Sequence, residues 1–285
     1  MSDSNHQTVP GSGGTTDDPA MGSFTNVDAA PETDVMLHAL DQIASLPAVQ
    51  RLKAAAIELL KPARGQRLLD VGCGTGEDTR TLAAHVGPTG SVIGVDPSET
   101  MLEEARRRTG HRNMQVEFRR GDATDLALDD GSVDGCRCER VFQHLPEPER
   151  AMAELVRVTR PGGRIVVIDT DWGLHAVHGA DPHLTSRVLE CWERSLANGR
   201  SGRSLPGLFA AAGIQDPEVR VETMVNVDGA TPSHPPFTVM TGVAQAEGAL
   251  SVEETRRWLD ELSDAGRRGQ FFWAVTMFAV GGQRP

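Results

Sequence analysis

Between residues 67 and 169, short apolar runs alternate with longer stretches that carry apolar residues on one helical face. The apolar runs are bounded by Gly, Pro and Asp, and their length is typical of buried strands. We predict strands at 67–71, 91–95, 115–118, 133–138 and 164–169, and helices at 78–85, 99–108 and 147–159. Such regular alternation favours a parallel, doubly wound α/β sheet.

The pattern loosens on both sides of this region. Residues 1–20 are rich in Ser, Gly, Asp and Pro, which predicts a disordered acidic tail. Helical spacing at 35–46 and 49–60, interrupted at Pro47, predicts an N-terminal helical cap segment over 21–62. The main domain would then cover 63–285, with a strand at 218–225, a helix at 251–264 and a final strand at 271–280. We expect cap insertions around 170–215, which looks helical, and around the Pro-rich stretch 226–250.

Charge and apolar length exclude several classes of partner. The 285 residues include 40 acids and 28 bases, for a net charge of −12, and half of that charge lies before residue 35. So acidic a chain lacks the basic surface of a nucleic-acid or anionic-membrane binder, and we expect neither partner. The longest apolar stretch is about half of a membrane span. With no pattern of a secretory signal, we predict a cytoplasmic protein.

Two residue types limit the chemistry. The four cysteines, Cys73, Cys136, Cys138 and Cys191, do not have the spacing of a zinc site, and we expect no metal. The chain has no tyrosine, which excludes any mechanism that needs a phenol as acid, base or nucleophile.

The segment from Leu68 to Gly76 is the most informative motif. An apolar run ends in Asp70, and glycines at 72, 74 and 76 then open the predicted helix. Glycines allow the backbone to pass close to a ligand, and a helix N-terminus presents unpaired N–H groups. A dinucleotide fingerprint needs Gly or Ala where Glu77 stands, so NAD and FAD are disfavoured.

Acids also follow the next two predicted strands. Asp96 ends the second strand, where a carboxylate can accept both hydroxyls of a ribose. Asp122 follows the third strand, where it can accept a hydrogen bond from an exocyclic amine. A single acid at a strand end is more often a cap or turn residue. Acids at three successive strand ends, the first in a glycine loop, favour a nucleoside ligand instead.

These motifs resemble the class I S-adenosylmethionine-dependent methyltransferases over residues 64–169. The resemblance rests on the loop 70–76, the segments 95–101 and 121–123, and Arg160-Pro161-Gly162-Gly163. It implies a Rossmann-like, mostly parallel seven-stranded sheet with helices on both faces, an antiparallel last strand and a helical cap. It also implies S-adenosylmethionine as the cofactor.

The resemblance assigns cofactor contacts by position. The glycine loop would lie under the methionine part, Asp96 would hold the ribose and Asp122 the adenine amine, and Pro97 or Met101 would flank the ring. Glu139 and Arg140 are charged where many members are small or apolar; a Glu near the cofactor ammonium, or an Arg near its carboxylate, would be favourable. The implied set is Asp70, Gly72, Cys73, Gly74, Gly76, Asp96, Pro97, Met101, Gly121, Asp122, Ala123, Glu139 and Arg140.

Candidate catalytic and substrate residues lie in two further segments. His144 follows the fourth strand, beside the expected position of the transferred methyl, although a polar residue is common there whatever the substrate. Asp171 and His175 follow the fifth strand, where open α/β sheets bind ligands. Alternatively, Asp171 caps a turn and Trp172 fills the cap interface. The candidate substrate contacts are Phe24, Trp172 and Arg203.

The main functional hypothesis is methyl transfer to the oxygen, nitrogen or carbon of a small molecule, with a role in secondary metabolism. One alternative is carbon methylation that triggers cyclisation of a terpenoid or polyene, and another is cofactor binding without transfer. A dehydrogenase is a more distant alternative. Methylation of a nucleic-acid base is disfavoured because Arg140-Val141-Phe142 stands where an Asn or Asp followed by two prolines would be expected. A homo-oligomer is allowed by the sequence.

Overall fold

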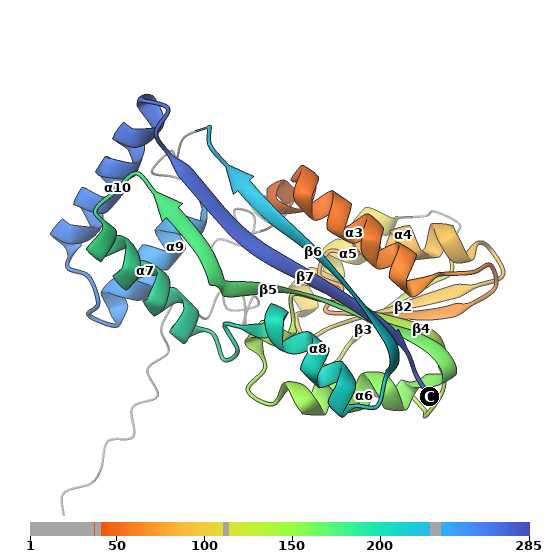
Figure 1. Cartoon of the computed structure of the whole chain (residues 1–285). Helices are drawn as coiled ribbons and strands as arrows, with labels where there is room; N and C mark the ends of the chain where they lie inside the picture. Colours follow the sequence, from red (N-terminus) through yellow and green to blue (C-terminus); the bar gives the residue numbers. More distant parts are fainter. Residues whose placement is uncertain (1–36, 38–40, 111–113, 229–234) are drawn as a thin grey trace, which may run out of the picture.

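The computed structural model describes residue 37 and residues 41–110, 114–228 and 235–285 (Figure 1). The predicted tail, the candidate substrate residue Phe24 and most of the predicted helix at 35–46 lie outside the described residues. Residues 41–45 are helical, as that prediction expects.

A seven-stranded sheet forms the centre of the fold, in the order β3-β2-β1-β4-β5-β7-β6. β1 to β5 pair in parallel, whereas β7 is antiparallel to both β5 and β6. This confirms the predicted doubly wound, mostly parallel sheet with an antiparallel last strand. The strands are β1 (Arg67–Val71), β2 (Ser91–Asp96), β3 (Val116–Arg120), β4 (Val133–Glu139), β5 (Thr159–His178), β6 (Gln215–Asn226) and β7 (Phe272–Gln283).

Helices cover both faces of the sheet (Figure 1). One apolar core lies between the sheet and α3 and α4, and a second lies between the opposite face and α6 and α8. α3 therefore packs along the sheet itself. The helices are α3 (Pro47–Leu60), α4 (Glu77–Val86), α5 (Glu99–Thr109), α6 (Pro148–Val158), α7 (Pro182–Ser195), α8 (Ser201–Ala211), α9 (Pro235–Ala246) and α10 (Val252–Arg267), with a short 3-10 turn η2 (Phe142–His144).

The main difference from the sequence prediction concerns residues 170–178. They continue β5 as far as His178, where a helical insertion was expected. The physical reason is tertiary pairing, because Ala176, Val177 and His178 pair with the beginning of β7. Such distant pairing overrides the local pattern, and the helices of this region begin only at Pro182.

The far ends of β5 and β7 extend beyond the parallel strands and carry a group of helices, α7, α9 and α10 (Figure 1). Aromatic side chains fill the space between these helices and the strands. Trp258 and Phe237 are buried at 0% and 1% exposure, and their rings pack edge to face, with centroids 5.5 Å apart.

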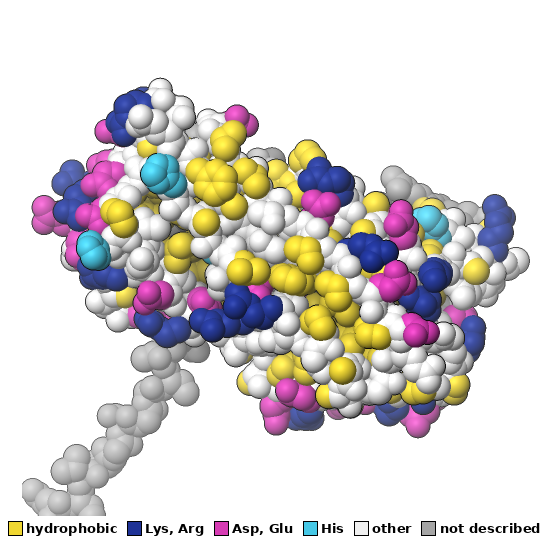
Figure 2. Space-filling view, in the orientation of Figure 1, with side chains coloured by type: hydrophobic (Ala, Val, Ile, Leu, Met, Phe, Trp, Pro, Cys, Tyr) yellow, Lys and Arg dark blue, Asp and Glu magenta, His cyan; other side chains and the backbone are white. Residues whose placement is uncertain are grey.

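Apolar side chains also reach the surface along the edge strand. Val219, Val221 and Val225 of β6 are exposed, on the same side of the strand, and Figure 2 shows hydrophobic side chains gathered over this part of the sheet. Within the described part of the chain, no helix combines the length and the apolar composition that crossing a membrane requires.

Candidate functional site

The loop between β1 and α4 is shaped by three glycines with left-handed backbone. Gly72, Gly74 and Gly76 have φ values of 72°, 49° and 75°, which other residues adopt only at a cost. A Cβ on Gly72 would overlap the side chain of Val141, and one on Gly76 would lie 2.7 Å from the ring of Phe118. A Cβ on Gly74 would meet no atom within 4 Å. The loop is thus packed at both ends and open in the middle.

Asp96 connects this loop to the end of β2. Its Oδ2 accepts a hydrogen bond from the Gly74 N–H at 2.8 Å, and its Oδ1 accepts one from the Ser98 N–H at 3.0 Å. The Gly121 N–H donates to the Asp96 carbonyl at 3.1 Å, which brings the end of β3 to the same place. The structure therefore gathers the three predicted strand ends at one edge of the sheet.

The other candidates around Asp96 differ in exposure. Asp122 is exposed, and its Oδ1 accepts hydrogen bonds from the backbone N–H and the hydroxyl of Thr124, both at 2.7 Å. Pro97 is exposed, whereas the side chains of Met101 and Ala123 are buried. The side chains of Asp122 and Pro97 are thus accessible to a ligand, whereas those of Met101 and Ala123 are buried beside them.

Asp70 does not face an open position. It is 1% exposed, accepts a hydrogen bond from the Thr79 hydroxyl at 2.6 Å and pairs with Arg137 at 3.2 Å. Burial raises the pKa of Asp70 to about 6, although Arg137 opposes the shift. The carboxylate thus connects the end of β1 to α4 and β4, and the direct ligand contact expected from the sequence stays a prediction.

Arg137 is the centre of a buried charge network. Its guanidinium, 3% exposed, pairs with Asp70, with Asp78 at 3.1 Å and with Glu139. Burial disfavours its charge, but the three carboxylates outweigh burial and raise the pKa of Arg137. A buried cation with three anionic partners fixes the relative positions of β1, β4 and α4.

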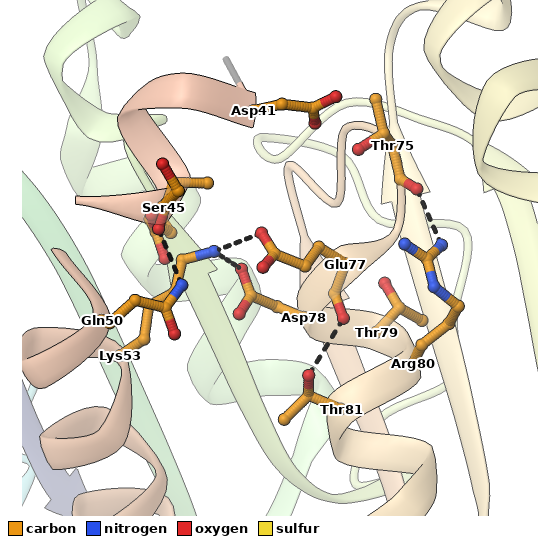
Figure 3. Close-up of polar contacts among 12 residues, drawn as sticks. Asp41, Ser45, Gln50, Lys53, Thr75, Glu77, Asp78, Thr79, Arg80 and Thr81 are labelled. Atoms are coloured by element: carbon orange, nitrogen blue, oxygen red, sulfur yellow. Dashed lines mark hydrogen bonds and ion pairs between the residues drawn. The ribbon is translucent and has the colours of Figure 1, made fainter. Parts of the chain in front are cut away.

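Lys53 extends the network to α3. Its Nζ lies 2.8 Å from Glu77 Oε2 and 2.9 Å from Asp78 Oδ2, at the first turn of α4 (Figure 3). Burial lowers the pKa of Lys53, but Glu139 and Asp78 outweigh it, and the net pKa is raised. Asp41 also pairs with Arg108 at 2.7 Å. Ion pairs therefore connect the helical segment before β1 to the start of α4 and to the end of α5.

Glu139 and Arg140 end β4 beside this network. Arg140 has a left-handed φ of 54°, and its Nε lies 3.3 Å from Glu139 Oε1. Glu139 is 7% exposed, and its Oε1 has no hydrogen-bond partner among the described residues. This oxygen lies within ion-pair distance of Arg140 but accepts no hydrogen bond among the described residues, so it can accept one from a cationic ligand.

Hydrogen bonds fix the state of His144. The indole Nε1 of Trp172 can only donate, and it donates to Gln143 Oε1 at 2.8 Å. Gln143 Nε2 must then be the donor toward His144 Nε2, 3.2 Å away, so that the neutral ring carries its proton on Nδ1. Burial, with a contribution from Arg140, lowers the pKa of His144 to about 4. At neutral pH the ring is uncharged.

Asp171 and Arg203 form an ion pair. Asp171 is fully buried, and both of its oxygens accept hydrogen bonds from the Arg203 guanidinium, the second at 2.8 Å from Nη2. The candidate catalytic residue Asp171 and the candidate substrate contact Arg203 thus form an ion pair between β5 and α8, and their roles at a substrate stay predictions. This bidentate pairing occupies both oxygens of the buried Asp171, whereas the Arg203 side chain is 41% exposed.

His175 lies among indole rings. Trp273 Nε1 donates a hydrogen bond to His175 Nε2, and burial lowers the pKa of His175 to about 3. So weak a base is a poor proton acceptor, which argues against the predicted catalytic role. The ring keeps its proton on Nδ1, and this tautomer makes it a hydrogen-bond donor.

Sequence reasoning missed several residues of the site. These residues are Lys53, Arg137, Gln143 and Asp169. Asp169 accepts hydrogen bonds from the Gln143 N–H at 2.8 Å and from the Ser201 hydroxyl at 3.0 Å. An arginine between Cys136 and Cys138 in an apolar strand was an available signal, since a buried cation needs partners. Among the described residues, no cluster of three or more His, Cys, Asp or Glu is placed to hold a metal ion.

A methyltransferase-domain family model matches residues 69–167, which include the glycine loop and all three strand ends. An uncharacterised 37.1 kDa protein in transposon TN4556 of Streptomyces fradiae is 38% identical over 243 residues, 85% of this chain and 69% of that protein. The chain belongs to the class I S-adenosylmethionine-dependent methyltransferases. Over 42% of its length, the methyltransferase is also 39% identical to the demethylmenaquinone methyltransferase of Clavibacter sepedonicus. This match covers 47% of that relative.

The fold agrees with this assignment. The crystal structure of the YcgJ protein of Bacillus subtilis has a TM-score of 0.57 and 19% sequence identity, and the match covers 83% of this methyltransferase and 99% of that chain. The cofactor of the methyltransferase is S-adenosylmethionine. The residues present fit it, because the loop is open at Gly74 and the buried Oε1 of Glu139, although paired with Arg140, accepts no hydrogen bond among the described residues.

Two alanine substitutions in the glycine loop should differ in their effects on stability and on cofactor binding. Gly72→Ala should lower the free energy of unfolding by about 2–4 kcal/mol, because the left-handed backbone and the overlap with Val141 both oppose a Cβ. Gly74→Ala should lower it by only about 1 kcal/mol but weaken S-adenosylmethionine binding at least about tenfold, since its Cβ enters the open side. Urea unfolding and calorimetric titration measure the two effects. An equal loss of stability in both variants would contradict the described packing.

Proposed function

We propose that this methyltransferase transfers the methyl group to a small-molecule acceptor. The observation that carries the proposal is the hydrogen-bonded set formed by Gln143 and His144, which follow β4, and Trp172, which lies in the irregular part of β5 after Asp171. Their neutral, partly aromatic character suits a small and partly apolar molecule. The relative named demethylmenaquinone methyltransferase and the net charge of −12 support this acceptor class over a nucleic acid.

The cofactor would be held by residues from four strand ends. We propose that Asp96 accepts hydrogen bonds from the ribose hydroxyls, that Asp122 accepts one from the adenine amine, and that Pro97 and Met101 flank the ring. Gly72, Cys73, Gly74 and Gly76 would lie beneath the methionine portion, with Gly121 and Ala123 beside the adenine. Glu139 Oε1 would accept from the ammonium group, and Arg140 would pair with the carboxylate.

When bound, S-adenosylmethionine supplies a methyl group already activated on a sulfonium. The chain then has to orient the acceptor and exclude water. His144 can donate a hydrogen bond from Nδ1 to an acceptor oxygen. It can take a proton only at Nε2, where Gln143 donates in the described network. We therefore propose His144 as the catalytic side chain of the acceptor site, where its Nδ1–H orients the acceptor, while the proton that the acceptor loses on methylation leaves to water.

His144 variants separate catalysis from cofactor binding. His144→Ala should lower kcat by about 10²-fold or more and leave S-adenosylmethionine affinity within about twofold, because the ring acts on the acceptor. Since the neutral ring is the active form and its pKa is about 4, kcat should stay level from pH 7 down to about pH 5 and fall at lower pH. His85→Ala on the exposed face of α4 is the control. A loss of activity centred near pH 6.5, or an unchanged kcat for His144→Ala, would remove His144 from the mechanism.

Radiolabel partition tests the acceptor class directly. The enzyme is incubated with methyl-labelled cofactor and a deproteinised, nucleic-acid-free extract, or with total protein, or with total nucleic acid. We expect label only in the small-molecule fraction. Transfer to either macromolecular fraction alone would refute the proposal.

Two alternatives accompany this proposal. Carbon methylation coupled to cyclisation stays open, because no described residue separates carbon from oxygen or nitrogen acceptors. Cofactor binding without transfer predicts saturable binding and no labelled product in any fraction. We also propose the cap insertions, a cytoplasmic location and a role in secondary metabolism. We further propose a homo-oligomer, and the exposed valines of β6 offer one surface for its interface.

A further inference from the structure

The regular pairing of β5 with β7 is interrupted after Asp171. Asp171 pairs with Thr276 and Ala176 with Ala274, so β5 advances five residues while β7 advances two. Bulged segments of this kind redirect side chains and occur near functional sites. Here the bulge contains Trp172 and His175, whose rings pack edge to face with centroids 5.4 Å apart.

Two further rings complete what we call the tryptophan box, defined as Trp172, His175, Trp192 and Trp273. Trp192 of α7 packs against Trp172 at a centroid distance of 5.3 Å and an interplanar angle of 84°. Trp273 of β7 packs against His175 at 5.9 Å and 80°. The four rings thus form a chain of edge-to-face contacts, the arrangement that aromatic pairs prefer.

Two nitrogen atoms of the box are buried and lack partners among the described residues: His175 Nδ1 and Trp192 Nε1. Because Trp273 Nε1 donates to His175 Nε2, the neutral imidazole carries its proton on Nδ1. An indole N–H can only donate. Both orphaned atoms are therefore donors, and a buried donor without an acceptor costs free energy. The box lacks a hydrogen-bond acceptor.

The box adjoins the proposed methyl-transfer site. Trp172 belongs to the box and donates to Gln143, which in turn donates to His144. The Trp172 N–H also donates to the Gly199 carbonyl at 2.9 Å, which fixes the bulge against the turn before α8. A molecule in the box would thus lie next to the residues that follow β4.

We propose that the tryptophan box binds the methyl acceptor, and that this acceptor is a planar aromatic molecule with a carbonyl or phenol oxygen that accepts hydrogen bonds from His175 Nδ1 and Trp192 Nε1. The inference rests on the proposed function, since it names the substrate class of that site. A protonated amine is excluded as the group recognised in the box, because two donors repel a third.

Equilibrium dialysis with two matched probes tests the proposal. 2-Acetylnaphthalene has the ring and a carbonyl, and 2-ethylnaphthalene has the ring without the oxygen. With the full chain and S-adenosylhomocysteine present, the ketone should bind at least about tenfold more tightly than the hydrocarbon. Trp192→Phe and His175→Phe should each reduce this preference by about fivefold or more. Trp258→Phe should retain it, since that indole N–H already donates to the Thr185 hydroxyl at 2.9 Å.

Thermal unfolding without a probe gives an independent readout. Trp192→Phe should leave the melting temperature unchanged or raised, because it removes a donor that has no partner, whereas Trp258→Phe should lower it. Equal binding of the two probes by the wild type, an undiminished ketone preference in Trp192→Phe, or a melting temperature lowered as much as in Trp258→Phe would each overturn the proposal. Since dialysis requires no methyl transfer, a ketone preference without any labelled product would refute the proposed function and leave the box standing.

Discussion

Arg137→Met should lower the free energy of unfolding by about 3–5 kcal/mol, the largest effect on stability that we expect from one substitution. Arg137 is 3% exposed and pairs with Asp70, Asp78 and Glu139. Removal of the cation leaves three carboxylates close together in a region of low dielectric, and uncompensated buried charge is strongly destabilising. Urea unfolding at pH 7 measures the loss.

The stability loss caused by Arg137→Met should become smaller as the pH falls. The folded-state pKa of Asp70 is already raised to about 6, mainly by burial, and the loss of Arg137 raises it further. A carboxyl with a raised folded-state pKa destabilises the fold increasingly as the pH rises toward that pKa, so the defect of Arg137→Met should shrink from pH 7 to pH 5.

Arg220→Met is the control for this experiment, because Arg220 pairs with Glu218 on the exposed edge strand and should change stability by no more than about 0.5 kcal/mol. Equal effects of the two substitutions would show that the buried network does not support the fold.

Asp96→Ala should weaken S-adenosylmethionine binding at least about tenfold in calorimetric titration. Hydrogen bonds to a charged group contribute roughly 1.5–3 kcal/mol, and Asp96 also holds the Gly74 N–H at 2.8 Å. Asp130→Ala, at an exposed acid that pairs with Arg157, is the matched control and should leave affinity unchanged. Unchanged affinity in Asp96→Ala would refute the ribose assignment.

A double cycle separates the ribose contact from disturbance of the loop. Wild type and Asp96→Ala are each titrated with 5′-methylthioadenosine and with its 2′,3′-dideoxy analogue. If Asp96 accepts from the ribose hydroxyls, the wild type should prefer the parent nucleoside, and the variant should lose most of that preference. An equal preference in both proteins would assign the effect of Asp96→Ala to the loop alone.

The parallel part of the fold could be predicted because its signals are local. Apolar runs and glycine turns between 67 and 138 place β1, β2 and β4 within one residue of their observed bounds. The extension of β5 to His178 could not be predicted, because it depends on pairing with β7 and not on the pattern of residues 170–178. The residue pattern predicted a final strand at 271–280, but its antiparallel direction was expected only from the family resemblance.

The candidate site likewise contains residues that the sequence could identify and residues that it could not. Asp96 and Asp122 were identifiable because strand ends of a parallel sheet meet at one edge, which the hydrogen bond between Gly121 and Asp96 reflects. The partners of Asp70 and Asp171 were not, because Arg137 and Arg203 reach them through tertiary packing. The proton positions on His144 and His175 depend on indole donors that only the folded chain brings together.

Mass spectrometry of methyl transfer tests the central claim most directly. The enzyme is incubated with methyl-deuterated S-adenosylmethionine and pools of candidate small molecules, with Asp96→Ala at the same concentration as the control. We predict that one class of small molecule gains a single deuterated methyl group, in an amount equal to the S-adenosylhomocysteine formed, and that the control forms at least about tenfold less at limiting cofactor. Saturable cofactor binding with no labelled small molecule, and no S-adenosylhomocysteine above the control, would contradict the account.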